Sequence, residues 1–262
     1  MKVAVAQIDS GNNEAENLAK MSRMIREAAE NGAELILFPE HAIYLGEDMK
    51  GHAHSDHDAF AETLSEIARE NHIYLHCGSF SEKREKDDNP YNSSLFFDKE
   101  GKLLAKYSKI HLFEADIPDG ASVREADTVK AGEEITLAET EFGKAGFAIC
   151  YDLRFPELFY QMAKAGAKLI FMPANFTAET GKAHWEILLR ARAIENTCYI
   201  LAAGQIGKKP EFHAYGHSMI IDPWGEVLAE AGEGEELIYA QLSEERLKEV
   251  RQQMPSLRNH RL

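Results

Sequence analysis

Short apolar segments alternate with amphipathic segments along the chain. The runs Lys2–Ile8, Glu34–Pro39 and Ala167–Pro173 are mostly apolar, which is typical of strands that are buried on both faces. The segments Glu14–Asn31 and Phe155–Ala165 place their apolar residues on one side only, which is typical of helices that cover a sheet. The pattern therefore predicts an α/β protein with helices on the outside of its strands.

The same criteria predict the other elements of the chain. Further helices are expected at Asp58–Asn71, Lys182–Asn196 and Glu244–Gln253. Further strands are expected at His72–Phe80, Ser94–Asp98, Leu103–Lys106, Lys144–Cys150, Cys198–Ile206, His217–Asp222, Glu226–Glu230 and Leu237–Leu242. The sequence shows no repeat, linker or low-complexity segment, so residues 1–262 are expected to form a single domain.

Charge and composition narrow the possible partners. The 262 residues include 44 acidic and 29 basic ones, a net charge of −15, which argues against binding nucleic acid or an anionic membrane surface. No apolar run reaches the roughly 18 residues of a membrane span, and the first residues lack the apolar core of a signal peptide. The three cysteines Cys77, Cys150 and Cys198 are too widely spaced for a disulfide framework, so we expect free thiols and a cytoplasmic protein.

Three polar residues follow predicted strands. Glu40 follows Glu34–Pro39, Lys109 follows the strand at Leu103, and Cys150 ends an apolar run just before a predicted helix. Strand ends of α/β folds are where catalytic groups collect, and the start of a helix offers free N–H groups to a thiolate or an oxyanion. Each residue also has an ordinary structural interpretation, as a cap, a solvated strand end or a core cysteine.

The segments around these residues form a recognisable set. They are Phe38-Pro39-Glu40, Lys106-Tyr107-Ser108-Lys109-Ile110-His111-Leu112-Phe113 and Cys150-Tyr151-Asp152-Leu153-Arg154-Phe155-Pro156-Glu157, followed by Thr180–Glu186, Arg190–Asn196, Tyr215–Ser218 and Asp222–Gly225. In this order they resemble the nitrilase superfamily of carbon–nitrogen hydrolases, and the later segments resemble the branch that contains omega-amidase and deaminated glutathione amidase. The resemblance covers nearly the whole chain and implies a four-layer α-β-β-α sandwich.

The resemblance implies a Glu–Lys–Cys triad of Glu40, Lys109 and Cys150. It also implies a second glutamate, which falls on Glu125, although Ala126 stands where the family usually has serine. Glu114 is the competing candidate for this second glutamate. In the implied mechanism Glu40 is the general base, Cys150 forms a thioester, and Lys109 and the backbone N–H of Tyr151 stabilise the oxyanion.

The implied substrate is a small amide whose far end carries a carboxylate, such as the omega-amide of a 2-oxo acid. No metal or organic cofactor is implied. The residues expected to bind the substrate are Arg154, Asn175, Phe176, Thr177 and Tyr44. Deaminated glutathione, a nitrile or a carbamoyl compound are alternative substrates within the superfamily. The resemblance further implies a homodimer or a higher homo-oligomer, paired through the helices at Phe155–Ala165 and Lys182–Asn196.

Three interpretations from other classes stay open. His52, His54 and His57 crowd one segment and could hold a metal ion for a metal-dependent hydrolase, against the alternative of a solvated loop. Cys150, His111 and Asp152 could form a Cys–His–Asp hydrolase. A binding module without activity would have lost one of the triad positions, and all three are present.

Overall fold

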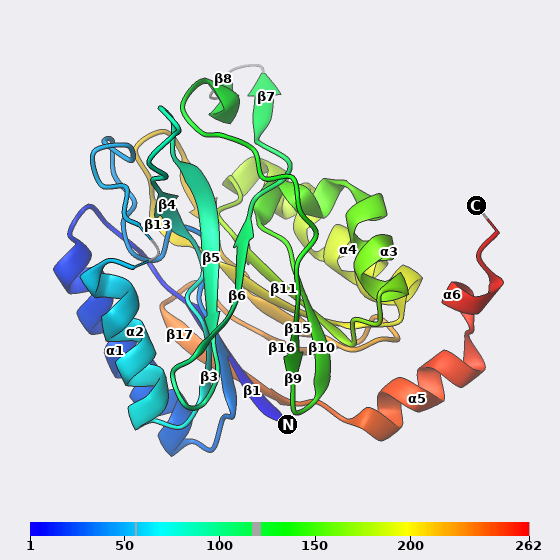
Figure 1. Cartoon of the computed structure of the whole chain (residues 1–262). Helices are drawn as coiled ribbons and strands as arrows, with labels where there is room; N and C mark the ends of the chain where they lie inside the picture. The colour runs from blue at the N-terminus through cyan, green and yellow to red at the C-terminus, as the bar shows by residue number, and fades with distance from the viewer. Residues whose placement is uncertain (56, 117–121, 262) are drawn as a thin grey trace.

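The computed structural model describes residues 1–55, 57–116 and 122–261, and its main elements form four layers (Figure 1). Two sheets lie face to face. Helices α1 (Glu14–Glu30) and α2 (Ala59–Glu70) cover the outer face of the first sheet, and α3 (Pro156–Lys164) and α4 (Ala178–Asn196) cover that of the second. The expected α-β-β-α sandwich is confirmed.

The first sheet has seven strands, and its order mixes parallel and antiparallel pairs. Along the sheet the strands are β17 (Glu236–Gln241), β1 (Lys2–Gln7), β2 (Leu35–Leu37), β3 (Tyr74–His76) and β5 (Tyr91–Phe97), with β4 (Phe80–Glu82) and β6 (Leu103–Ser108) both paired to β5. Strands β1, β2 and β3 run parallel, so the residues that follow them lie at one edge of the sheet.

The second sheet has six strands and also mixes parallel and antiparallel pairs. In order they are β16 (Val227–Glu230), β15 (Met219–Ile221), β12 (Tyr199–Gly204), β11 (Leu169–Ala174), β10 (Gly143–Phe147) and β9 (Leu137–Thr140). In the part of the chain that the structure describes, the remaining elements are two small hairpins, two short 3-10 turns and two C-terminal helices. They are β7 (Glu114–Asp116) with β8 (Ser122–Arg124), β13 (Ile206–Lys208) with β14 (His213–Tyr215), η1 (Glu125–Asp127), η2 (Cys150–Arg154), α5 (Glu244–Gln253) and α6 (Ser256–Asn259).

Strand β1 explains why the strands are apolar without alternation. Val3 and Val5 point into the core between the two sheets, whereas Ala4 and Ala6 point toward α1 and α2. Because both faces are covered, an exposed polar position has no place on this strand. In the part of the chain that the structure describes, no helix is both long and apolar enough to cross a membrane.

The predicted strand His72–Phe80 is two strands in the structure, and the break matters for the site. Gly78 lies between β3 and β4 with a left-handed φ of +76°. A Cβ at Gly78 would lie 2.0 Å from the carbonyl oxygen of Pro39, the residue before Glu40. Only glycine permits this close approach, so the break packs the Gly78 turn directly against the segment that carries Glu40.

Candidate active site

The three predicted catalytic residues meet at one cavity between the two sheets. Glu40 follows β2 and Lys109 follows β6 in the first sheet, whereas Cys150 begins η2, just after β10 of the second sheet. All three side chains line a cavity of about 740 Å³. Each of the three residues is buried. The structure therefore brings together three groups that are far apart in the sequence.

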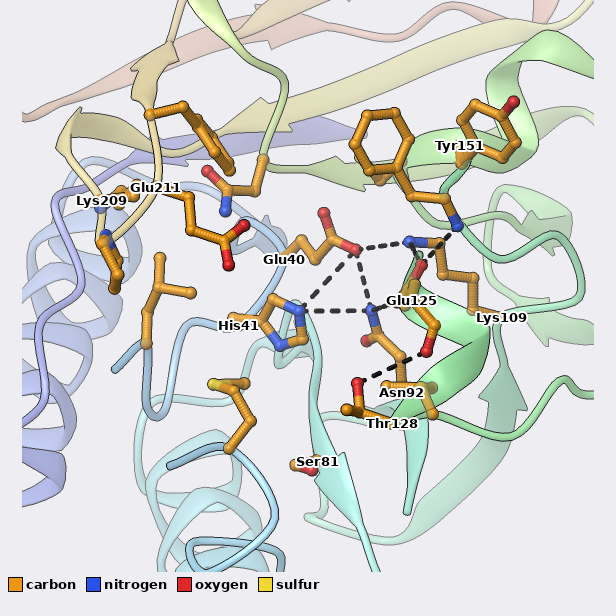
Figure 2. Close-up of a pocket in the computed structure, with 18 of the residues that line it drawn as sticks. Glu40, His41, Ser81, Asn92, Lys109, Glu125, Thr128, Tyr151, Lys209 and Glu211 are labelled. Atoms are coloured by element: carbon orange, nitrogen blue, oxygen red, sulfur yellow. Dashed lines mark hydrogen bonds and ion pairs between the residues drawn. The ribbon is translucent and has the colours of Figure 1, made fainter. Parts of the chain in front are cut away.

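Lys109 is the centre of the charged cluster. Its ammonium Nζ lies 3.1 Å from Oε1 of Glu40 and 2.8 Å from Oε2 of Glu125 (Figure 2). Burial opposes the charge on Lys109, but the carboxylates of Glu125 and Glu40 outweigh it and hold the pKa of Lys109 well above its ordinary value. Lys109 is thus a fixed cation whose side chain is buried.

Glu125 occupies the position that the resemblance implied for a second glutamate. It begins η1, and its Oε2 accepts hydrogen bonds from Lys109 and, at 2.6 Å, from the backbone N–H of Phe113. The competing candidate, Glu114, has an exposed side chain that faces Arg124 at 3.6 Å instead. Of the two glutamates, only Glu125 pairs with Lys109 among the described contacts.

Cys150 lies at a sharp turn between strand and 3-10 helix. Its backbone has a φ of +48°, a left-handed conformation that is strained for a residue other than glycine. Burial, reinforced by the negative charge of Glu40, raises the pKa of the Cys150 thiol well above its ordinary value. The Glu40 carboxylate is near enough to act on the pKa of this thiol. The resting cysteine is therefore protonated and has a carboxylate base beside it.

The pKa of Glu40 is shifted in the opposite direction, below its ordinary value. Burial raises the pKa of its carboxyl group, but the neighbouring Lys109 ammonium outweighs burial, and the net pKa lies below the ordinary value. Its carboxylate is thus ionised at neutral pH. A buried carboxylate next to a protonated thiol and a fixed ammonium can abstract a proton and stabilise a developing oxyanion.

The amino-acid sequence matches a known family over nearly the whole chain. The sequence model of the family described as carbon-nitrogen hydrolase covers residues 2–252. The chain belongs to the carbon–nitrogen hydrolase family.

Relatives of this hydrolase are amidases. Deaminated glutathione amidase from Synechocystis sp. is 42% identical, over 98% of this chain and 96% of the relative. Omega-amidase NIT2 from Homo sapiens is 37% identical, over 99% of this chain and 95% of the relative. The crystal structure of Saccharomyces cerevisiae Nit3, a member of branch 10 of the nitrilase superfamily, matches with a TM-score of 0.89 and 34% identity, covering 97% of this chain and 94% of that one.

Asp152 supports the turn at Cys150 in this hydrolase. It is fully buried, and its two oxygens accept hydrogen bonds from four groups. These are Tyr107 Oη at 2.7 Å, the backbone N–H of Ile149 at 2.8 Å, the backbone N–H of His111 at 2.9 Å and the ring Nδ1 of His111 at 2.7 Å. His111 is stacked on Phe155 and is absent from the described lining of the cavity. The pair His111–Asp152 is thus built into the scaffold behind Cys150.

Most of the residues expected to bind the substrate line the cavity. Tyr151, Arg154, Asn175, Phe176 and Thr177 all belong to its wall. The guanidinium of Arg154 lies over the rings of Phe176 and Tyr151, at 5.3 and 5.6 Å, and within 3.3 Å of the ring Nδ1 of His184. The structure gives it no carboxylate partner in residues 1–55, 57–116 and 122–261.

Tyr44 lies elsewhere, which corrects its expected place over the cavity. Its ring stacks on His52 at 3.9 Å, and it lines the neighbouring cavity rather than the one that holds Cys150. The reason is that the Tyr44 ring packs against the face of the His52 ring and is buried there.

The histidine-rich segment is attached to the first helix. His52 Nδ1 lies 2.7 Å from Glu14 Oε1, and His54 contacts both Glu14 and Asp58, at 3.2 and 3.3 Å. Within the described residues, no group of three His, Cys, Asp or Glu side chains is arranged to hold a metal ion. His52 and His54 therefore hold the loop that follows Tyr44 against α1.

Two residues of the site were not predicted. Asn92 of β5 donates a hydrogen bond from Nδ2 to Oε1 of Glu40 at 2.8 Å, and His41 contacts the same two side chains (Figure 2). A signal for Asn92 exists in the sequence, because Asn92-Ser93-Ser94 places polar residues within an otherwise apolar strand. All three are buried in the structure.

Proposed function

We propose that this chain hydrolyses the terminal carboxamide of a small carboxylate-bearing substrate, such as the omega-amide of a 2-oxo acid, through a thioester on Cys150. The observation that carries the proposal is the buried cation Lys109, held between Glu40 and Glu125 beside a protonated cysteine. Glu40, Lys109 and Cys150 are the proposed catalytic residues, with Glu125 as the second anion that holds Lys109.

In the first half of the reaction, Glu40 takes the proton of the Cys150 thiol while the sulfur attacks the amide carbonyl carbon. The carbonyl oxygen becomes an oxyanion, which Lys109 and the backbone N–H of Tyr151 stabilise. One such donor contributes about 3 to 4 kcal/mol. Glu40 then gives its proton to the amide nitrogen, the carbon–nitrogen bond breaks, and ammonia leaves. The acyl group remains on the sulfur as a thioester.

In the second half, Glu40 removes a proton from water, and the resulting hydroxide attacks the thioester carbonyl. The same donors stabilise the second oxyanion. The carbon–sulfur bond breaks, the sulfur takes the proton back from Glu40, and the carboxylic acid leaves. Lys109 transfers no proton in this scheme, in agreement with a pKa that keeps it charged throughout.

Arg154 is the proposed partner of the substrate carboxylate. A guanidinium binds a carboxylate with two parallel hydrogen bonds, and Arg154 has no acidic partner among the described side chains. Asn175, Phe176 and Thr177 line the adjoining wall. An acyl group that carries its own carboxylate would thus extend from Cys150 toward Arg154.

Deaminated glutathione is the second candidate substrate. The support for it is the 42% identity to a deaminated glutathione amidase, against 37% to an omega-amidase. The two substrate types share a 2-oxo acyl group and differ in the amine that leaves. A cavity of about 740 Å³ leaves room for the larger leaving group.

Assembly and location are also proposals. We infer a single domain that pairs into a homodimer or a higher homo-oligomer through α3 and α4. The support is the exposure of Ile187 and Ile194 on α4, whose side chains would be covered by such pairing. Cys77, Cys150 and Cys198 are free thiols, which supports a cytoplasmic location.

The test is product release from matched amides by the wild-type chain, Cys150→Ala and Cys77→Ala. The amides are 2-oxoglutaramate, deaminated glutathione, glutamine and a simple aliphatic amide. We expect turnover of at least one 2-oxo amide, lost in Cys150→Ala and kept in Cys77→Ala, whose thiol lies in the other core cluster. Turnover that survives Cys150→Ala would refute the mechanism, and faster turnover of the aliphatic amide would refute the substrate class.

A further inference from the structure

One oxygen of Glu40, Oε1, receives the contacts from Asn92, Lys109 and His41. Asn92 Nδ2 lies 2.8 Å from Oε1 and Lys109 Nζ lies 3.1 Å from the same atom. His41 Nε2 lies 4.0 Å from Oε1 as well. Figure 2 shows these contacts meeting on one oxygen, while the other oxygen of Glu40 carries none of the marked interactions.

Asn92 reaches both carboxylates that flank Lys109. Besides Glu40, its Nδ2 lies 3.5 Å from Oε1 of Glu125. A carboxylate only accepts hydrogen bonds, so the amide group must turn its NH₂ toward Glu40 and Glu125. Its Oδ1 is consequently buried without a hydrogen-bond partner among the described residues. An unpaired buried oxygen is costly and needs a reason, and the fixed orientation of the NH₂ group supplies one.

His41 also has a buried polar atom without a hydrogen-bond partner among the described residues. Its backbone is left-handed, with a φ of +56°, a conformation that is uncommon for residues other than glycine. Its Nε2 lies 3.4 Å from Asn92 Nδ2, and its Nδ1 is buried with no partner in the described structure. Burial lowers the pKa of His41, so the ring is neutral and its Nε2 can accept from the Asn92 amide.

We propose that Asn92 and His41 are positioning residues for Glu40: Asn92 fixes Oε1 together with Lys109, and His41 holds the Asn92 amide, so that only Oε2 exchanges a proton with Cys150. The inference rests on the proposed role of Glu40 as the general base. Oε2 takes the thiol proton and gives it to the leaving nitrogen, and neither step requires the carboxylate to rotate. The charged and titratable groups that face Glu40 are Lys109, His41, Cys150 and, beyond Lys109, Glu125.

The contact between Asn92 and Glu40 predicts how the reactivity of Cys150 depends on pH. The Asn92 N–H stabilises the ionised form of Glu40, so its loss raises the pKa of Glu40. The base is then protonated up to a higher pH. A purely structural role for Asn92 would lower the amount of folded protein without moving this limb of the pH profile.

The experiment measures the rate of Cys150 alkylation by iodoacetamide against pH, which requires no knowledge of the amide substrate. Variants are Asn92→Ala and Asn92→Leu, with Asn71→Ala at the C-terminal end of α2 as the matched control. We expect roughly 10- to 100-fold slower alkylation at neutral pH in both Asn92 variants, as for the loss of a hydrogen bond to a charged group. We also expect the acid limb to move to higher pH, and wild-type behaviour in the control.

His41→Leu and His41→Asn test the second residue. Asparagine tolerates the left-handed backbone and keeps an acceptor, whereas leucine does neither. We expect His41→Asn to restore much of the alkylation rate that His41→Leu loses. Equal rates in these two variants would overturn the role of His41.

Unshifted pH profiles in folded Asn92→Ala and Asn92→Leu would overturn the role of Asn92, whatever their rates. With a turned-over amide, we expect kcat to fall and KM to stay constant, and a rise in KM alone would assign Asn92 to substrate binding instead. If no amide is turned over by the wild-type chain but the alkylation profiles shift as expected, the proposed substrate class fails and the positioning role stands.

Discussion

Lys109 and Glu125 form an ion pair in which Nζ and Oε2 lie 2.8 Å apart and the Lys109 side chain is buried. Glu125 reaches the cavity from η1, which follows the hairpin of β7 and β8, and the same oxygen binds the backbone of Phe113. This anchor makes Glu125 a rigid partner rather than a mobile surface charge. The pair therefore keeps an ammonium group ionised where burial alone would favour its neutral form.

Glu125→Gln is expected to reduce kcat on a turned-over amide by about 100-fold or more. Breaking a buried ion pair costs up to about 3 to 5 kcal/mol, and this substitution leaves Glu40 as the remaining described carboxylate beside Lys109. The measurement is steady-state kinetics beside Glu114→Gln, whose side chain is 71% exposed. Equal losses in the two variants, or none in Glu125→Gln, would contradict the role of Glu125.

Arg154→Gln is expected to raise KM for a carboxylate-bearing amide by roughly 30- to 100-fold. This is the effect of losing charge-assisted hydrogen bonds worth about 2 to 3 kcal/mol. A simple aliphatic amide has no carboxylate, so its low kcat/KM should stay the same in the variant. Kinetics on both amides make the comparison, and a parallel loss on the two would mean that Arg154 only maintains the fold around Phe176.

His111→Ala is expected to keep measurable turnover. His111 contacts Asp152 rather than the cavity, so its loss weakens the support of the Cys150 turn without removing the base. Asp152→Ala should be far more harmful to stability, because four donors, two of them buried, would lose their acceptor. Thermal unfolding and kinetics of the two variants are the measurements, and complete inactivity of a folded His111→Ala would favour the Cys–His–Asp scheme.

The fold was predictable where both faces of a strand are covered. Lys2–Ile8 has no polar alternation because Val3 and Val5 face one layer and Ala4 and Ala6 another. The break at Gly78 was not predicted, because the run His72–Phe80 is apolar on both sides of it and the contact that demands glycine is with distant Pro39. Local pattern carries no information on such a long-range approach.

Only those site residues that belong to sequence motifs could be predicted. Glu40, Lys109, Cys150 and Glu125 meet as the resemblance implied, because strands from the two sheets end at the same cavity. Asn92 and His41 were missed because their importance lies in which oxygen of Glu40 they contact. Tyr44 was misplaced since a tyrosine near Glu40 in sequence can pack on either of two neighbouring cavities.

His76 is expected to make the protein less stable in mild acid. The ring lies between the sheets against Phe147 and Phe171, at centroid distances of 5.4 and 4.8 Å, and burial lowers the pKa of His76 to about 3. The unfolded chain binds this proton near pH 6.5, so the folded state is favoured above pH 6.5 and loses stability as the pH falls from there toward 3. The slope is about 1.4 kcal/mol per pH unit, and the whole interval corresponds to at most about 5 kcal/mol.

The free energy of unfolding in urea, measured between pH 7.5 and about 4.5, tests this expectation. In His76→Asn the side-chain oxygen can replace Nδ1 as the acceptor of the Gly78 N–H, which lies 3.1 Å from the ring nitrogen. This variant should be less stable at pH 7.5, because the smaller side chain leaves a void, but its stability should depend less on pH. His72→Asn is the matched control, because His72 is an exposed histidine with a left-handed backbone that asparagine tolerates. The same slope in His76→Asn and in the wild-type chain would show that other groups take up the proton.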